Sequence, residues 1–125
     1  MSKHETKMTR CYAKTRYPKG HLIEEFKALK QPKTNSKRHM DGVIVFRNPF
    51  VKRELIKGER VVVIQSKNRR LGMGLIGQVI VSRDLVERLG VQVMRSVAVC
   101  TEMETVMHKM LRKHPRCRAV VYRAA

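Results

Sequence analysis

The sequence predicts a small α+β domain built on a curved five-stranded sheet or a small β-barrel, with two or three helices packed against it. Short runs rich in Val and Ile alternate with turn residues, which is typical of buried strands. Other segments place apolar residues at helical spacing. The chain of 125 residues is 42% apolar, so it can bury one core. Five strands in so short a chain favour a closed or strongly curved sheet.

Residues 1–20 predict a basic extended arm, because Lys and Arg recur there without a regular apolar face. Such an arm can lie along phosphates while its tyrosines stack on bases. A solvated tail whose tyrosines pack on the body is the equal alternative. The nucleic-acid contacts predicted in this arm are Lys14, Arg16 and Tyr17. Residues 21–125 are predicted to form a single domain.

The clearest predicted helix spans residues 101–113, with Thr101 as N-cap, Glu104 three residues later and Pro115 beyond its end. Three shorter helices are also predicted. The first spans residues 21–30 and ends before Pro32, and the second spans residues 50–57 and is capped by Gly58. The third spans residues 84–89, with Asp84 as N-cap and Gly90 at its end.

The predicted strands are the Val- and Ile-rich runs that turn residues bound. Residues 31–42 are polar and predict a loop. In chain order, the strands cover residues 43–47, 60–66, 75–82, 91–100 and 118–123.

The most apolar part of the chain, residues 58–83, also holds a G-x-G-x-x-G pattern at Gly72, Gly74 and Gly77. A dinucleotide fingerprint needs a strand before the glycines and a helix after them. Because a strand is predicted after them, we interpret the glycines as a tight connection between strands. Its cations, Lys67, Arg69 and Arg70, would form a tip that holds phosphate.

The net charge of +18 comes from 28 Lys and Arg against 10 Asp and Glu. This excess runs through every part of the chain and predicts a polyanionic partner, with nucleic acid foremost. A solvated basic surface and an anionic membrane surface are the alternatives. Besides the arm, the predicted nucleic-acid contacts are Lys52, Arg53, Lys57, Lys67, Arg69 and Arg70.

Neither a metal site nor a cofactor is predicted. Cys100, His108, His114 and Cys117 are residue types that bind zinc, but their spacing matches no standard finger. No catalytic residue is predicted either, so the chain is not expected to be an enzyme. A small nuclease or base-modifying enzyme is the third hypothesis, and it would need Glu, His and Lys clustered and buried in a cleft.

Residues 55–84 resemble the middle of PUA-like domains, including the ASCH and EVE groups. Their K-G-D-x-V start is matched except at Glu59, where the family usually has Asp. The same stretch is similar to the KOW motif of ribosomal and transcription-elongation proteins, which has a glycine at the place of Arg70 or Leu71. Both resemblances imply a small PUA-like or SH3-like β-barrel that handles RNA. The PUA-like pattern is matched at Lys57, Gly58, Val61, Ser66, Ile76, Gly77 and Val79.

The sequence therefore predicts a non-enzymatic RNA-binding protein, associated with the ribosome or another ribonucleoprotein, with DNA as the alternative nucleic acid. The second hypothesis is a regulatory protein that binds an acidic protein through the Met-rich face of residues 101–113. Three widely spaced cysteines and no apolar leader predict a reduced cytoplasmic setting, with the mitochondrial matrix left open. No apolar run reaches the ~18 residues of a membrane span, so no membrane partner is expected.

Overall fold

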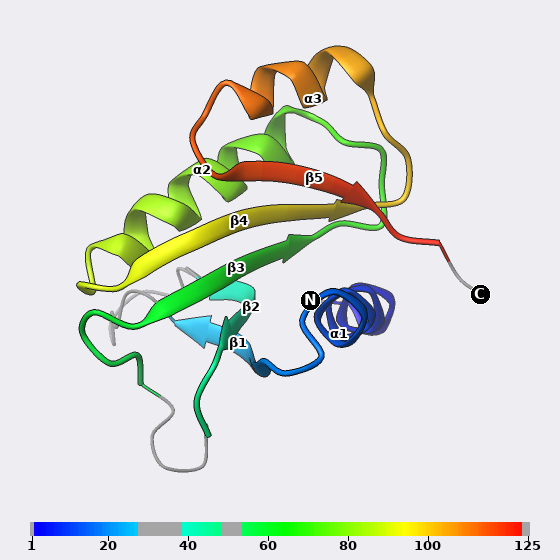
Figure 1. Cartoon of the computed structure of the whole chain (residues 1–125). Helices are drawn as coiled ribbons and strands as arrows, with labels where there is room; N and C mark the ends of the chain where they lie inside the picture. Colours follow the sequence, from blue (N-terminus) through cyan, green and yellow to red (C-terminus); the bar gives the residue numbers. More distant parts are fainter. Residues whose placement is uncertain (1, 28–38, 49–53, 124–125) are drawn as a thin grey trace, which may run out of the picture.

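The computed structural model describes residues 2–27, 39–48 and 54–123, which form three helices and five strands (Figure 1). Within these residues, none of the helices has the length and apolar character needed to cross a membrane. The elements, in chain order, are α1 (Lys3–Arg16), β1 (His21–Lys27), β2 (His39–Val45), β3 (Arg60–Ser66), α2 (Met73–Glu87), β4 (Gln92–Cys100), α3 (Thr105–Arg112) and β5 (Cys117–Val121).

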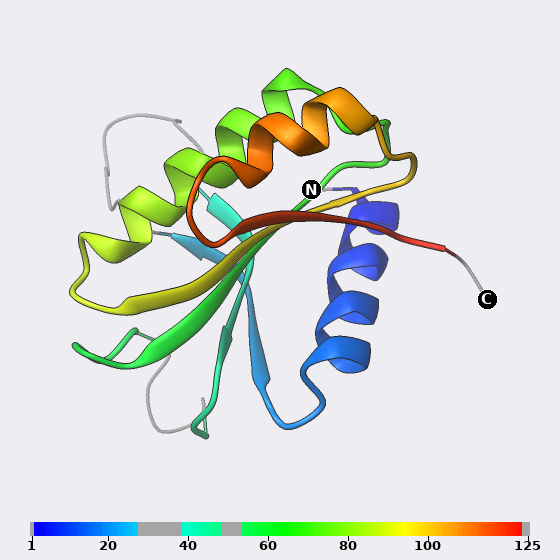
Figure 2. The same cartoon turned by 45° about the horizontal axis from the view of Figure 1, so that its top comes forward.

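The five strands form one mixed sheet in the order β1-β2-β3-β4-β5. The pairs β1–β2 and β2–β3 are antiparallel, and the pairs β3–β4 and β4–β5 are parallel. The parallel pairs are joined through α2 and α3, which cover one face of the sheet, while α1 covers the other (Figures 1 and 2). The predicted α+β class with a curved five-stranded sheet is confirmed. The sheet is not closed into a barrel, because β1 and β5 lie at its two edges.

The central strand β3 is buried on both faces, which explains its unbroken apolar run. Because side chains alternate along a strand, Val62 and Ile64 pack with Met8 of α1, whereas Val61 and Val63 pack with the cluster that includes Val86 of α2. A third cluster unites α2, α3, β4 and β5 on the α2 side; it contains Leu71, Leu75, Val79, Ala98, Cys100, Leu111, Cys117 and Ala119.

The predicted extended arm at the N-terminus is wrong, because most of it forms α1. Ser2 and Glu5 form a capping box at its start, and Met8 and Ala13 are buried against the sheet. Tyr17 packs edge-to-face on Tyr12 and on Phe46, with ring centroids 6.1 Å and 6.0 Å apart. The tyrosines therefore pack on the body of the protein, as the alternative interpretation expected.

The strand predicted at 75–82 is also wrong, because these residues belong to α2. Its buried residues are Leu75, Val79, Ser82 and Val86, which lie at the spacing of one helical face. A continuous apolar run does not distinguish a buried strand from a buried helix, and the β-branched residues favoured the strand. Asp84 consequently lies inside the helix and is not its N-cap.

The prediction of a helix at 21–30 is wrong for the residues that the structure describes, since β1 occupies residues 21–27. Residues 54–57 of the helix predicted at 50–57 are not helical, and its first residues, 50–53, lie outside the described residues. Gly58 and Gly90 do occupy turns, with φ of +88° and +84°, which favour glycine.

The other predicted elements are confirmed, most of them with shifted ends. The strand predicted at 43–47 is β2, which begins earlier, at His39, so the end of the predicted loop is strand. The strands predicted at 60–66, 91–100 and 118–123 are β3, β4 and β5. The long helix predicted at 101–113 is α3. It is capped by Glu104, whose side chain accepts a hydrogen bond from the Met107 amide, and not by Thr101.

Candidate functional site

The candidate site begins where β2 separates from β3. The pairing of these strands ends at Gly42 and Ile64, although β2 stays paired with β1 as far as His39. Beyond the last pair, the amide of Ser66 donates a hydrogen bond of 2.6 Å to Oδ2 of Asp41. A side chain of β2 thus takes the place of a backbone acceptor, and a half-buried carboxylate lies at the point where the strands diverge.

A second carboxylate reaches the same end of β3 from the first turn of α1. Oε2 of Glu5 accepts a hydrogen bond of 3.1 Å from the amide of Asn68, and the amide of Ser2 lies 3.4 Å from Oε1. Asp41 and Glu5 therefore bind the backbone amides on either side of Lys67.

The charges of these groups act on one another. Burial is the largest cause that raises the pKa of the Asp41 carboxyl above its ordinary value, and the negative charge of Glu5 raises it further. The hydrogen bond from Ser66 and the positive charge of Lys67 act in the opposite direction without cancelling the rise. The structure therefore brings together two carboxylates and one ammonium group. A carboxyl with a perturbed pKa, such as that of Asp41, occurs frequently at functional sites.

Close packing holds α1 against the site. The hydroxyls of Thr9 and Ser66 form a buried hydrogen bond of 2.7 Å. A Cβ added at Gly42 would lie 2.9 Å from Cγ2 of Thr9 and 2.6 Å from Cδ1 of Leu22. The absence of a side chain at Gly42 thus allows α1 to approach β2, and this approach carries Glu5 to the neighbourhood of Asp41.

Gln65 is a buried amide on the other face of the sheet. It is 5% exposed, and its Nε2 donates a hydrogen bond of 2.7 Å to the Ser82 hydroxyl of α2. The next residue, Ser66, turns its hydroxyl toward Thr9 of α1, as expected from the alternation of side chains along a strand. Gln65 is therefore not counted in the cluster of Asp41, Glu5 and Lys67.

Carboxylate and amide oxygens are the ligands that Mg²⁺ and Ca²⁺ prefer. In the part of the chain that the structure describes, no three or more His, Cys, Asp and Glu residues gather as a metal site. Mg²⁺ is commonly bound by only one or two carboxylates together with waters and phosphate oxygens of the substrate. Asp41 and Glu5 fit that arrangement, whereas a site made wholly of protein ligands would need more.

Of the predicted nucleic-acid contacts that the structure describes, only Lys67 belongs to this cluster. Arg69 and Arg70 are exposed on the adjoining loop, where Arg70 forms an ion pair of 3.3 Å with Glu102. Lys57 precedes β3 and therefore lies at the opposite end of that strand.

The remaining predicted contacts lie elsewhere. Lys14, Arg16 and Tyr17 are at the C-terminal end of α1, and Tyr17 takes part in packing. Lys52 and Arg53 lie outside the described residues.

Sequence reasoning missed Glu5 and Asp41. The pattern S-x-x-E at Ser2 and Glu5 is a capping-box signal that could have indicated a helix here. Asp41 stands directly before Gly42 and a buried strand, and such a polar residue at a strand end was a further signal.

The G-x-G-x-x-G pattern does follow a strand and open a helix, contrary to the prediction, since Gly72 is the N-cap of α2. In the dinucleotide fingerprint, the third glycine permits close packing of helix on strand. Here a Cβ added at Gly77 would have no atom within 4 Å, and Gly77 is exposed. The glycines therefore lack the packing role that dinucleotide binding requires.

The Met-rich face of residues 101–113 is partly covered. Met103 and Met107 pack at the edge of the α2–α3 core cluster, while Val106 is 59% exposed and Met110 is 50% exposed. An exposed apolar patch here would favour the hypothesis of an acidic protein partner, and this face is exposed only in part.

Comparisons with protein-family models, curated proteins and solved structures found no match. The resemblance to PUA-like domains and to the KOW motif therefore stays a prediction. Within that stretch, residues 73–84 lie in α2, where the resemblance implies a strand.

Proposed function

We propose that the protein binds nucleic acid and hydrolyses a phosphodiester bond with the help of a divalent cation. The observation that supports this proposal is the convergence of Asp41, Glu5 and Lys67 at the diverging ends of β2 and β3. The small-enzyme hypothesis asked for Glu, His and Lys clustered and buried in a cleft. The cluster supplies two carboxylates and an ammonium group, all half-buried, and it has no histidine.

The class of substrate follows from charge. A protein with a net charge of +18 attracts polyanions, and nucleic acid is the polyanion that also contains a hydrolysable phosphodiester. Arg69 and Arg70 lie on the loop that continues from Lys67, so further cations flank the cluster. The predicted nucleic-acid partner is thus retained in the proposal, and RNA and DNA are both substrates to be tested.

Each residue of the cluster has a chemical role in this proposal. Asp41 and Glu5 would hold the cation, and a bound cation supplies an activated water and neutralises phosphate charge. Lys67 would stabilise the negative charge that develops on the phosphate oxygens. The water oxygen bonds to phosphorus, the bond to one sugar oxygen breaks, and that oxygen receives the proton.

Non-enzymatic RNA binding is the second candidate. It is favoured by the positive charge spread over the whole chain and by the exposed Arg69 and Arg70, which can bind phosphate without Asp41. In that candidate, Asp41 and Glu5 would only hold α1 against the end of β3.

The deciding experiment incubates the purified chain with end-labelled RNA and DNA, single-stranded and double-stranded, with Mg²⁺, with Mn²⁺ or with EDTA. We expect cleavage with the cations and none with EDTA, together with binding that weakens steeply as salt rises. Salt-dependent binding without cleavage of any substrate would favour the second candidate. Retention of an acidic protein, with no affinity for nucleic acid, would contradict both and favour the protein-partner hypothesis.

Cleavage should also depend on pH through Asp41. A cation binds the ionised carboxylate, and the raised pKa means that this carboxyl takes up its proton at a higher pH than an ordinary Asp. At Mg²⁺ concentrations below saturation, we expect the rate to fall as the pH is lowered, beginning above the ordinary Asp value of about 3.9. Rates measured between pH 4 and pH 8 at several Mg²⁺ concentrations check this; a rate independent of pH over that range would contradict it.

A further inference from the structure

The outer face of α1 carries a row of cations. Lys3, Lys7, Arg10 and Lys14 are spaced by four, three and four residues, so they follow one side of the helix. With a rise of about 1.5 Å per residue, the row is about 16 Å long. Met8 and Ala13 lie on the other side of α1, where they are buried against the sheet.

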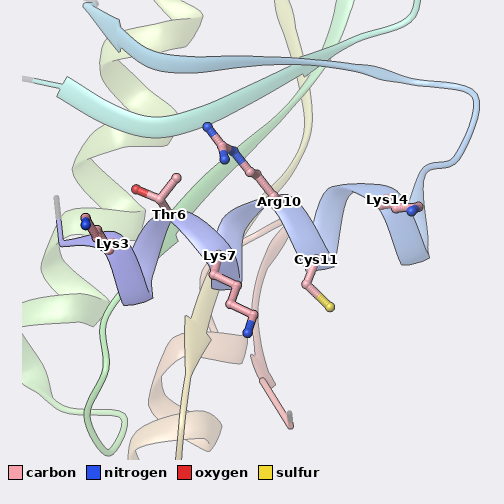
Figure 3. A pocket seen from close by; sticks show the side chains of 6 residues that line it. All are labelled: Lys3, Thr6, Lys7, Arg10, Cys11 and Lys14. Atoms are coloured by element: carbon pink, nitrogen blue, oxygen red, sulfur yellow. The ribbon is translucent and has the colours of Figure 1, made fainter. Parts of the chain in front are cut away.

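The row borders an open groove of about 600 Å³, lined by these four residues together with Thr6 and Cys11 (Figure 3). Lys3, Lys7 and Lys14 are exposed. Arg10 turns toward β1, where its Nη2 donates a hydrogen bond of 3.0 Å to Oε2 of Glu24 (Figure 3). Arg10 therefore has an acidic partner, and the lysines are the main cations that this face offers to a ligand.

We propose that the phosphate backbone of one nucleic-acid strand lies along this α1 face. This inference rests on the nucleic-acid binding in the proposed function, and it does not depend on hydrolysis. The row matches a linear polyanion in charge and in shape, because its cations are arranged in a line.

Cys11 permits a direct test, because it lies in the groove while Cys100 and Cys117 are buried. We expect a bound oligonucleotide to slow alkylation of Cys11 by a maleimide at least several-fold, in EDTA, so that no cleavage occurs. Protection should disappear at a salt concentration that abolishes binding. Unchanged alkylation with the oligonucleotide fully bound would overturn the inference, as would protection by anionic vesicles and not by nucleic acid.

A pair of double variants provides a matched test of charge. Lys7→Ala with Lys14→Ala removes two cations from the row, and Lys109→Ala with Lys113→Ala removes two exposed cations from the region of α3 across the sheet. The slope of log affinity against log salt should fall by about 1.4 to 1.8 in the α1 variant, since each phosphate contact contributes about 0.7 to 0.9. Equal slopes in the two variants would overturn the inference.

These measurements separate the two proposals. Protection of Cys11 and the altered salt slope concern binding alone, so they can hold even where no substrate is cleaved, in which case only the proposed hydrolysis fails. Cleavage that depends on Mg²⁺, with Cys11 freely alkylated in the bound state, would support hydrolysis and reject the α1 track.

Discussion

Replacement of Asp41 by Asn is expected to reduce Mg²⁺-dependent cleavage by about 10²- to 10³-fold, because cation-assisted stabilisation of a transition state is worth several kcal/mol. Asn keeps the size of the side chain and an oxygen that can accept the hydrogen bond from Ser66, but it removes the negative charge that binds the cation. Affinity for nucleic acid should remain, since the basic groups are unchanged. Single-turnover cleavage and equilibrium binding in EDTA measure the two effects separately.

Stability gives an independent measure of the same Asp41→Asn variant. A carboxyl whose pKa is raised in the folded state is stabilised by its proton, so that contribution is present at low pH and is lost as pH rises through the folded-state pKa. Ionised Asp41 therefore disfavours folding at neutral pH. We expect the melting temperature of the Asn variant at pH 7 to equal or exceed that of the wild type, with the difference shrinking in acid.

Asp84→Asn is the matched control for Asp41→Asn. Asp84 is exposed on α2, where it pairs with Arg83 at 3.1 Å. This change also removes one negative charge. Because Asp84 is a surface residue away from the site, the variant should cleave at a rate within about twofold of the wild type. Full cleavage activity in Asp41→Asn, or equal loss in both variants, would contradict the assignment of the site.

Replacement of Gly42 by Ala is expected to lower the free energy of unfolding by about 1 to 3 kcal/mol, the usual effect of overpacking. The added methyl would lie 2.9 Å from Cγ2 of Thr9 and 2.6 Å from Cδ1 of Leu22, so these side chains must shift. A shift of α1 would also move Glu5 away from Asp41, and we expect cleavage to fall more than stability alone explains. Urea unfolding gives the free energy, and cleavage is measured where both proteins are folded.

Gly77→Ala is the control for the Gly42 variant. Gly77 lies within α2 with open space around its Cβ position, so alanine should stabilise the helix by about 0.5 to 1 kcal/mol. The free energy of unfolding is therefore expected to fall in Gly42→Ala and to rise in Gly77→Ala. If Gly42→Ala were as stable as the wild type, the tight approach of α1 to β2 would be contradicted.

Several elements could be predicted because their local pattern allows one structure. The apolar run of β3 is bounded by turns and buried on both faces, and its bounds, residues 60–66, were predicted as observed. Residues 75–82 carry a similar apolar run, yet they form a helix. A strand and a helix differ in the spacing of the residues that they bury against the sheet. When almost every residue of a stretch is apolar, the sequence does not reveal which of them will be buried.

By itself, the sequence determined the α+β class, the buried strand at residues 60–66 and the strong positive charge, because these follow from composition and local pattern. Only the tertiary structure brought Glu5, Asp41 and Lys67 together, since they come from α1, β2 and the end of β3. Their meeting depends on two long-range features: the divergence of β2 from β3 and the close approach of α1 over Gly42. Neither feature leaves a local pattern, because each is a contact between segments distant in the chain.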